Sequence, residues 1–166
     1  MRILFYFAFC IITTQAILAQ ETSPLRYTKV ANGYLMVLRQ GDNLFAQLET
    51  LAQAEQIPSA NFTGMGFAEV EFGFFNFKKK TYRPKRFKAA ELAAMQGSIA
   101  WQNGKPSIHA HGLITNKKFK AFGGHILSAT VGTGSLEILV TVHDKKLERK
   151  KDEALGANIL CLDACR

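Results

Sequence analysis

The sequence predicts an α+β domain in which one main helix packs on a mixed, mainly antiparallel β-sheet. Two observations predict this class. Helical spacing of apolar residues occurs in one segment, residues 41–57, whereas the chain after it is rich in aromatic and β-branched runs punctuated by glycine. One helix beside many strands is typical of the α+β class. The 166 residues, 48% of them hydrophobic, are enough for a single core.

The helix is predicted from one apolar stripe. Its members recur at i, i+4, i+7 and i+8 and so line one helical face: Leu44, Leu48, Leu51 and Ala52. Asp42 is a suitable N-cap, because its carboxylate can accept a hydrogen bond from a free backbone N–H of the first turn. Pro58 cannot continue a helix, so we expect the helix to end before it.

Strands are predicted on both sides of this helix. Residues 27–40 precede it, and residues 59–77 follow it as a glycine-punctuated run that a basic segment closes into a hairpin. Residues 92–115 read as two strands joined at Asn103-Gly104, the strongest hairpin signal in the chain. Further strands are expected within residues 121–132, 136–143 and 157–162.

The N-terminal residues have the layout of a secretory signal peptide. Arg2 gives a positive start, residues 3–12 are an apolar run, and small residues lead to Ala19. We therefore expect a signal peptide at residues 1–19, export to the periplasm or the medium, and one domain over residues 20–166. A retained membrane anchor is the alternative, although the run is shorter than the roughly 20 residues of a spanning helix. No other segment is long enough to span a bilayer.

Export would permit disulfide bonds. Cys10 would leave with the signal peptide, so that Cys161 and Cys165 remain. Two cysteines four residues apart can bridge only if the chain turns between them. A local disulfide near the C-terminus and two free thiols both stay open.

A basic run gives the chain much of its net charge of +8. Such a run can bind nucleic acid or another anionic polymer, and it can equally be the solvated tip of a hairpin. Its candidate contact residues are Lys78, Lys79, Lys80, Arg83, Lys85 and Arg86. An exported protein would rarely meet a genome, which favours the solvated tip.

Three of the four histidines lie within residues 106–125. Residues two apart in a strand share a face, so His109 and His111 are expected to be neighbours on the side opposite Ile108 and Ala110. A strand-borne His-x-His can supply two metal nitrogens, and His125 after Gly123-Gly124 is the candidate third ligand from the next strand. A hydrogen-bonded surface pair is the alternative. We expect His143 to be an exposed histidine rather than a fourth ligand.

These motifs together resemble the PPC (plants and prokaryotes conserved) domain. The resemblance rests on the His-x-His strand, the Gly-Gly-His, and the apolar-Glu-apolar pattern at Leu136-Glu137-Ile138 in residues 104–140. It extends upstream through residues 35–57, 62–75 and 91–100, and it covers about residues 27–162 in all.

The resemblance implies several properties. The family fold is one helix on a mainly antiparallel sheet that assembles as a homotrimer, and prokaryotic members are linked to a zinc ion held by the three histidines, here His109, His111 and His125. The family is often labelled DNA-binding because plant members carry an AT-hook. This chain has no Arg-Gly-Arg-Pro core, since its nearest run, residues 83–86, lacks the glycine. The missing hook and the export signal both disfavour DNA binding.

Three imidazoles leave a tetrahedral zinc ion one open position, which suits ligand binding or chemistry. The favoured function is a zinc-holding module that binds a small molecule or anion. A zinc-dependent hydrolase or lyase at the same site is the first alternative, and a DNA-binding domain is the second. Glu137 is a weak candidate for a general acid or base, and a carboxylate that orients a histidine is its other reading. Whether the chain is an enzyme stays open.

Overall fold

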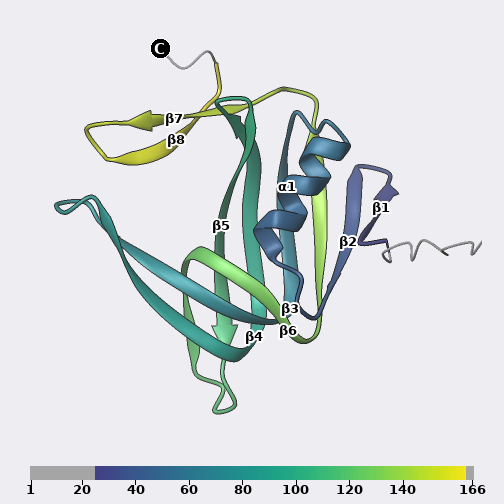
Figure 1. Ribbon diagram of the computed structural model, residues 1–166, viewed down its shortest axis with the longest axis vertical. Coiled ribbons are helices and arrows are strands. Elements are labelled where there is room, and N and C mark those ends of the chain that lie inside the picture. The colour runs from purple at the N-terminus through teal and green to yellow at the C-terminus, as the bar shows by residue number, and fades with distance from the viewer. Residues whose placement is uncertain (1–24, 164–166) are drawn as a thin grey trace, which may run out of the picture.

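The computed structural model describes residues 25–163, which form one large mixed sheet of eight strands and a single short helix (Figure 1). The elements follow the chain in this order: β1 (Tyr27–Val30), β2 (Gly33–Arg39), α1 (Leu44–Ala54), β3 (Ser59–Asn76), β4 (Thr81–Gln102), β5 (Lys105–Thr115), β6 (Ala121–His143), β7 (Glu148–Asp152) and β8 (Ala157–Cys161). The predicted signal peptide at residues 1–19 lies outside the described residues.

The expected α+β class is wrong. Strands account for 69% of the described residues and the helix for 8%, so the fold is predominantly β and has no helical layer. The physical reason is length: α1 has 11 residues, whereas β3, β4 and β6 have 18, 22 and 23. Stretches that read as separate strands or as a basic loop are continuous pieces of these long strands.

Helix α1 contributes one apolar face to the core. Its buried side chains are the four predicted from the sequence, Leu44, Leu48, Leu51 and Ala52. The N-cap is Asn43 rather than Asp42, because the Asn43 side chain accepts the Ala46 N–H at 3.0 Å. Asp42 instead forms an ion pair with Arg26 and accepts the backbone N–H of Arg39 at 2.7 Å. None of the described helices is long and apolar enough to cross a membrane.

The pairing of the long strands closes into a circuit. Strand β3 pairs with β4, β4 with β5, β5 with the first part of β6, and β6 returns to β3. Register shifts in the β3–β4 ladder at residues 64–66 and 68–70 mark bulges, which allow long strands to bend. The bend separates the end of the β3–β4 hairpin from the body of the sheet (Figure 1).

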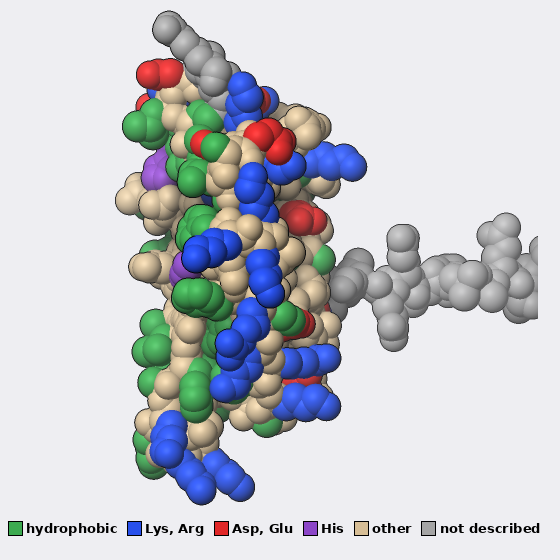
Figure 2. Space-filling view, turned by 90° about the vertical axis from the view of Figure 1, so that its left-hand side faces the viewer, with side chains coloured by type: hydrophobic (Ala, Val, Ile, Leu, Met, Phe, Trp, Pro, Cys, Tyr) green, Lys and Arg blue, Asp and Glu red, His purple; other side chains and the backbone are tan. Residues whose placement is uncertain are grey.

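The hairpin between β4 and β5 fixes the position of the histidine strand. Asn103 and Gly104 form its two-residue turn with φ of +52° and +76°, both in the left-handed region, as the Asn-Gly pair predicts. The charged segment after β6 forms a further antiparallel hairpin, β7–β8, which the sequence prediction missed in part. Strand β7 meets β4 in parallel at Trp101 and Glu148. Figure 2 shows Lys and Arg side chains spread over the face that carries the β3–β4 hairpin.

Candidate metal centre

Three histidines converge from β5 and β6. His109 and His111 are exposed on the outer face of β5, while Ala110 between them is buried, as strand alternation predicts. His125 in β6 lies directly opposite His111 in the β5–β6 ladder. Gly123 permits this close pairing, because a Cβ there would lie 2.6 Å from the carbonyl oxygen of Gly112.

The three rings lie close enough to share one ion. Their centroids are 5.0 Å apart for His109–His111, 5.0 Å for His109–His125 and 5.2 Å for His111–His125. One nitrogen from each ring lies within 4.8 Å of the other two. The Nε2 atoms of His109 and His111 are 3.2 Å apart, close to the spacing of about 3.3 Å expected for two nitrogens on one tetrahedral zinc ion. These residues can therefore hold a metal ion.

The surroundings of His109 and His125 lower the pKa of both imidazoles, which favours the neutral form that binds metals. Burial, followed by the positive charges that His109 and His111 would carry, lowers the pKa of His125 to about 4. Burial also lowers the pKa of His109, with smaller contributions from His111 and Arg149. The His125 ring stacks on Tyr82, with centroids 4.9 Å apart and planes 17° apart. A neutral ring can give its lone pair to a cation near neutral pH.

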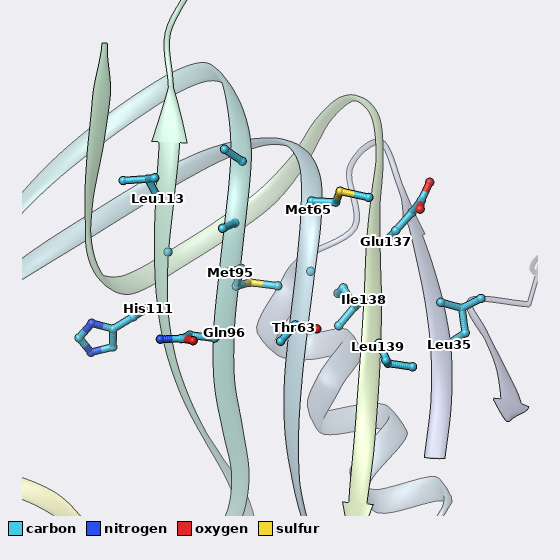
Figure 3. Close-up of a pocket in the computed structure, with 14 residues that line it drawn as sticks. Leu35, Thr63, Met65, Met95, Gln96, His111, Leu113, Glu137, Ile138 and Leu139 are labelled. Atoms are coloured by element: carbon cyan, nitrogen blue, oxygen red, sulfur yellow. The ribbon is translucent and has the colours of Figure 1, made fainter. Parts of the chain in front are cut away.

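The histidine cluster opens onto two neighbouring hollows of the outer sheet face. A polar groove of about 340 Å³ runs over β3, β4 and β5 and is lined by Asn61, Thr63, Gln96, Ser98, His109 and His111, among others. A larger, mainly apolar pocket of about 720 Å³ shares Thr63, Gln96 and His111 with it. Figure 3 shows His111 at one end of this pocket and Glu137 and Leu35 at the other. A ligand therefore has access to the cluster from the sheet face.

Glu137 is not part of the histidine cluster. It lies on β6 opposite Met65, and the row of strands from it to His111 is β6, β3, β4 and β5. The ladders put His111 in line with Leu139, two residues beyond Glu137. Three strand spacings of about 4.8 Å and this offset of about 7 Å along the strand put the backbones of Glu137 and His111 roughly 16 Å apart. Its carboxylate is exposed and forms no hydrogen bond or ion pair within residues 25–163. The geometry gives it no contact through which to orient a histidine.

The six basic candidates lie along the β3–β4 hairpin. Lys78, Lys79 and Lys80 form its turn, and the other three follow in β4. Several are engaged within the chain. Arg86 pairs with Glu69 at 2.8 Å, Lys80 donates to the Glu153 carbonyl at 2.6 Å, and the Lys85 ammonium lies 5.2 and 5.1 Å from the ring centroids of Phe87 and Phe122.

The two remaining sequence candidates are the cysteine pair and His143. Cys161 ends β8 and takes part in a disulfide bond. Cys165 lies outside the described residues, so the predicted pairing stays a prediction. His143 ends β6 beside Ser59 and lies apart from the cluster of three.

Sequence reasoning missed several neighbours of the cluster. In the β4–β5 ladder, Ser98 lies directly opposite His109, and Gln96 lies directly opposite His111. The Asn103-Gly104 turn could have predicted these pairs, since a two-residue turn fixes the hairpin register. Tyr82 and Arg149 had no comparable signal, because their positions depend on strands that meet only in the folded chain.

The fold and the site thus define the class of this protein: it is predominantly β and carries an accessible cluster of three histidines. The chain belongs to the Plants and Prokaryotes Conserved (PCC) domain family, which matches residues 25–144. This finding confirms the resemblance seen in the sequence. A search among curated proteins gave no match.

Solved structures similar to this chain include proteins from bacteria and archaea. A protein from Ralstonia eutropha JMP134, whose name suggests DNA binding, is 53% identical, with a TM-score of 0.81 over 83% of this chain and 96% of its own. A plant- and prokaryote-conserved protein from Pyrococcus horikoshii is 29% identical, with a TM-score of 0.68 over 73% and 85%. A metal-containing protein from Archaeoglobus fulgidus is 25% identical, with a TM-score of 0.71 over 84% and 99%.

Proposed function

We propose that this protein holds a zinc ion through His109, His111 and His125 and presents the open fourth position of that ion to a small ligand. One observation carries the proposal: a nitrogen of each ring lies within 4.8 Å of the other two. Imidazole nitrogens are common zinc ligands, and a site of three protein ligands keeps one position for water or a ligand. The related protein from Archaeoglobus fulgidus is named metal-containing, which supports a metal in this fold.

Export and trimer formation complete the proposal. The signal-like residues 1–19 support export with cleavage, and a disulfide at Cys161 is compatible with an oxidising compartment. The family resemblance supports a homotrimer. Apolar side chains exposed on the outer sheet face are suited to burial between copies: Leu35, Met65, Leu113 and Leu139. The mass of the native assembly measures the number of copies directly.

The test of the metal site is a double variant. We expect the His109→Ala/His111→Ala protein to lose stoichiometric zinc, because one imidazole that remains cannot hold the ion at micromolar concentrations. Elemental analysis of the purified protein measures the change. His143→Ala is the matched control, because it removes a histidine of the same sheet that lies outside the cluster. Undiminished zinc in the double variant contradicts the proposal.

DNA binding is a second candidate, supported by the name of the Ralstonia protein and by the basic β3–β4 hairpin. It predicts duplex affinity that falls steeply with salt, because bound phosphates release counterions. A hydrolase or lyase has less support. Within residues 25–163, the cluster of potential metal ligands contains three histidines and no carboxylate that could serve as a general base.

A further inference from the structure

The C-terminal hairpin places a buried guanidinium against Ser98, the β4 residue opposite His109. Arg149 in β7 is 6% exposed and lies beyond residues 25–144, the part of the chain that the family matches. It forms no ion pair with a carboxylate of the described residues. It donates instead to the carbonyl oxygen of Ser107, to the Ser98 carbonyl at 3.4 Å and to the Ser98 hydroxyl oxygen at 2.6 Å. A charge buried without an anion is costly, which points to a role beyond packing.

Ser98 connects this guanidinium to the histidine cluster. It lies opposite His109 in the β4–β5 ladder, and both residues line the polar groove beside the cluster. Because the Ser98 oxygen accepts a hydrogen bond from Arg149, the Ser98 O–H remains free to donate. The positive charge of Arg149 polarises that hydroxyl and makes it a stronger donor.

The groove offers further donors and no negative charge. Asn61 and Gln96 line it with side-chain amides that form no hydrogen bond to other described residues. None of its lining residues is Asp or Glu. The Arg149 guanidinium, 2.6 Å from the Ser98 hydroxyl oxygen, adds a positive charge beside the groove that Ser98 lines. A ligand that enters beside His109 therefore meets hydrogen-bond donors in a field of positive sign.

We propose that Ser98, oriented and polarised by Arg149, binds an oxyanion, a carboxylate or a phosphate, that occupies the open position of the metal. The inference rests on the proposed metal site and names the class of its ligand. Ser98 contacts the ligand, and Arg149 is a positioning residue that acts through Ser98. A purely structural Arg149 would fasten the β7–β8 hairpin to the sheet and would not discriminate between charged and neutral ligands.

The test compares anionic with neutral ligands on the cobalt-loaded protein, because the visible spectrum of cobalt reports exchange of the fourth ligand. Acetate and inorganic phosphate are the anionic probes, and imidazole is the neutral one. We expect Ser98→Ala to weaken whichever anion binds by roughly tenfold, the effect of one hydrogen bond to a charged group. Imidazole affinity should not change. The relative affinities of acetate and phosphate identify which oxyanion the groove prefers.

Two further variants separate recognition from folding. Ser128→Ala removes an exposed hydroxyl of β6 outside the groove and should leave all affinities as they are. Arg149→Gln should weaken anion binding about as much as Ser98→Ala, and the double variant should add little, since both changes remove one interaction. If Arg149→Gln does not fold, the anion affinity of the Ser98→Ala variant is sufficient to test the inference.

Metal content distinguishes the two ways in which the inference can fail. A wild-type protein that takes up no stoichiometric zinc or cobalt overturns the metal site itself, and the oxyanion inference with it. A protein that binds the metal, but whose Ser98→Ala variant binds acetate and phosphate as the wild type does, overturns the oxyanion inference alone. Equal losses for anions and imidazole also overturn it.

Discussion

The histidine cluster and the tip of the β3–β4 hairpin both stand out in the sequence, but the structure holds them in different ways. The histidines lie in adjacent strands, where His111 and His125 face each other at the end of the β5–β6 ladder and His109 is paired with Ser98 of β4. The basic residues 78–80 lie in an exposed turn at the end of a long hairpin. The first arrangement fixes the relative positions of its side chains, and the second leaves long side chains free to move.

The two regions also differ in how they accommodate positive charge. The hairpin satisfies part of its basic charge locally, through Glu69, the Glu153 carbonyl and the rings of Phe87 and Phe122. In the cluster, partial burial and repulsion between the rings lower the pKa of His109 and of His125 and so favour their uncharged forms. A dense run of one residue type is thus weak evidence for a site. Convergence from separate strands is stronger evidence, because it must be built by the fold.

The largest expected effect comes from a change in β4, the strand that pairs with the histidine strand β5. Gly97 lies between β3 and β5, where a Cβ would overlap the Phe62 ring and the carbonyl oxygen of His109. Gly97→Ala must push β5 outward, so we expect a loss of about 1–3 kcal/mol in the free energy of unfolding. Because His109 moves with β5, zinc affinity should fall about tenfold or more. Chemical denaturation and zinc titration measure the two effects.

Gly104→Ala in the β4–β5 turn is the matched control. A Cβ there meets nothing within 4 Å, but φ of +76° strains an alanine by about 1 kcal/mol. Both variants should lose stability, and Gly97→Ala alone should lose zinc affinity. Wild-type zinc affinity in Gly97→Ala would show that the cluster does not depend on the spacing of β4 and β5.

The second-largest expected effect is a loss of folding stability in acid by the metal-free protein. Its cause is the pKa of His125, about 4 in the folded chain against an ordinary value of 6.5. Between these two pH values the unfolded chain binds a proton that the folded chain does not. The stability that depends on a neutral His125 is therefore fully present above pH 6.5 and is lost as the pH falls toward 4. Thermal unfolding of chelator-treated protein across this window measures it.

His125→Gln should flatten the decline without abolishing it, because the pKa of His109 is lowered as well. His143→Gln, outside the cluster, should decline as the wild type does. Identical acid profiles for the wild type and His125→Gln would contradict the assigned cause, which is the burial of the His125 ring.

The features that the sequence predicts correctly depend on local rules. Alternation in β5 places His109 and His111 on the outer face, and the Asn103-Gly104 turn defines the hairpin. The buried stripe of α1 follows from helical spacing. Each of these features involves residues close in the chain, so periodicity and turn chemistry are sufficient.

The features that the sequence does not reveal depend on distant contacts. Arg149 lies in a run of charged residues in which local sequence does not distinguish it from its neighbours, yet the β7–β8 hairpin buries it against the carbonyl of Ser107. Arg26, 16 residues earlier in the chain, pairs with Asp42, and Asn43 takes the cap. The dominance of strands also follows from the pairing circuit, because long strands gain their stability from partners that local sequence does not identify.

The smallest expected effect comes from the hairpin tip. Lys78 and Lys79 are exposed and form no ion pair with other described residues, so Lys78→Ala/Lys79→Ala should change the free energy of unfolding by less than about 0.5 kcal/mol. Zinc content should not change.

If the tip binds a duplex, the variant should reduce the slope of log affinity against log salt by about 2, one for each lysine that no longer neutralises a phosphate. Lys117→Ala/Lys118→Ala, in the β5–β6 turn, is the control with the same loss of charge. An unchanged slope in the tip variant removes the tip as a DNA-binding element, and a loss of zinc would show that the two regions are coupled.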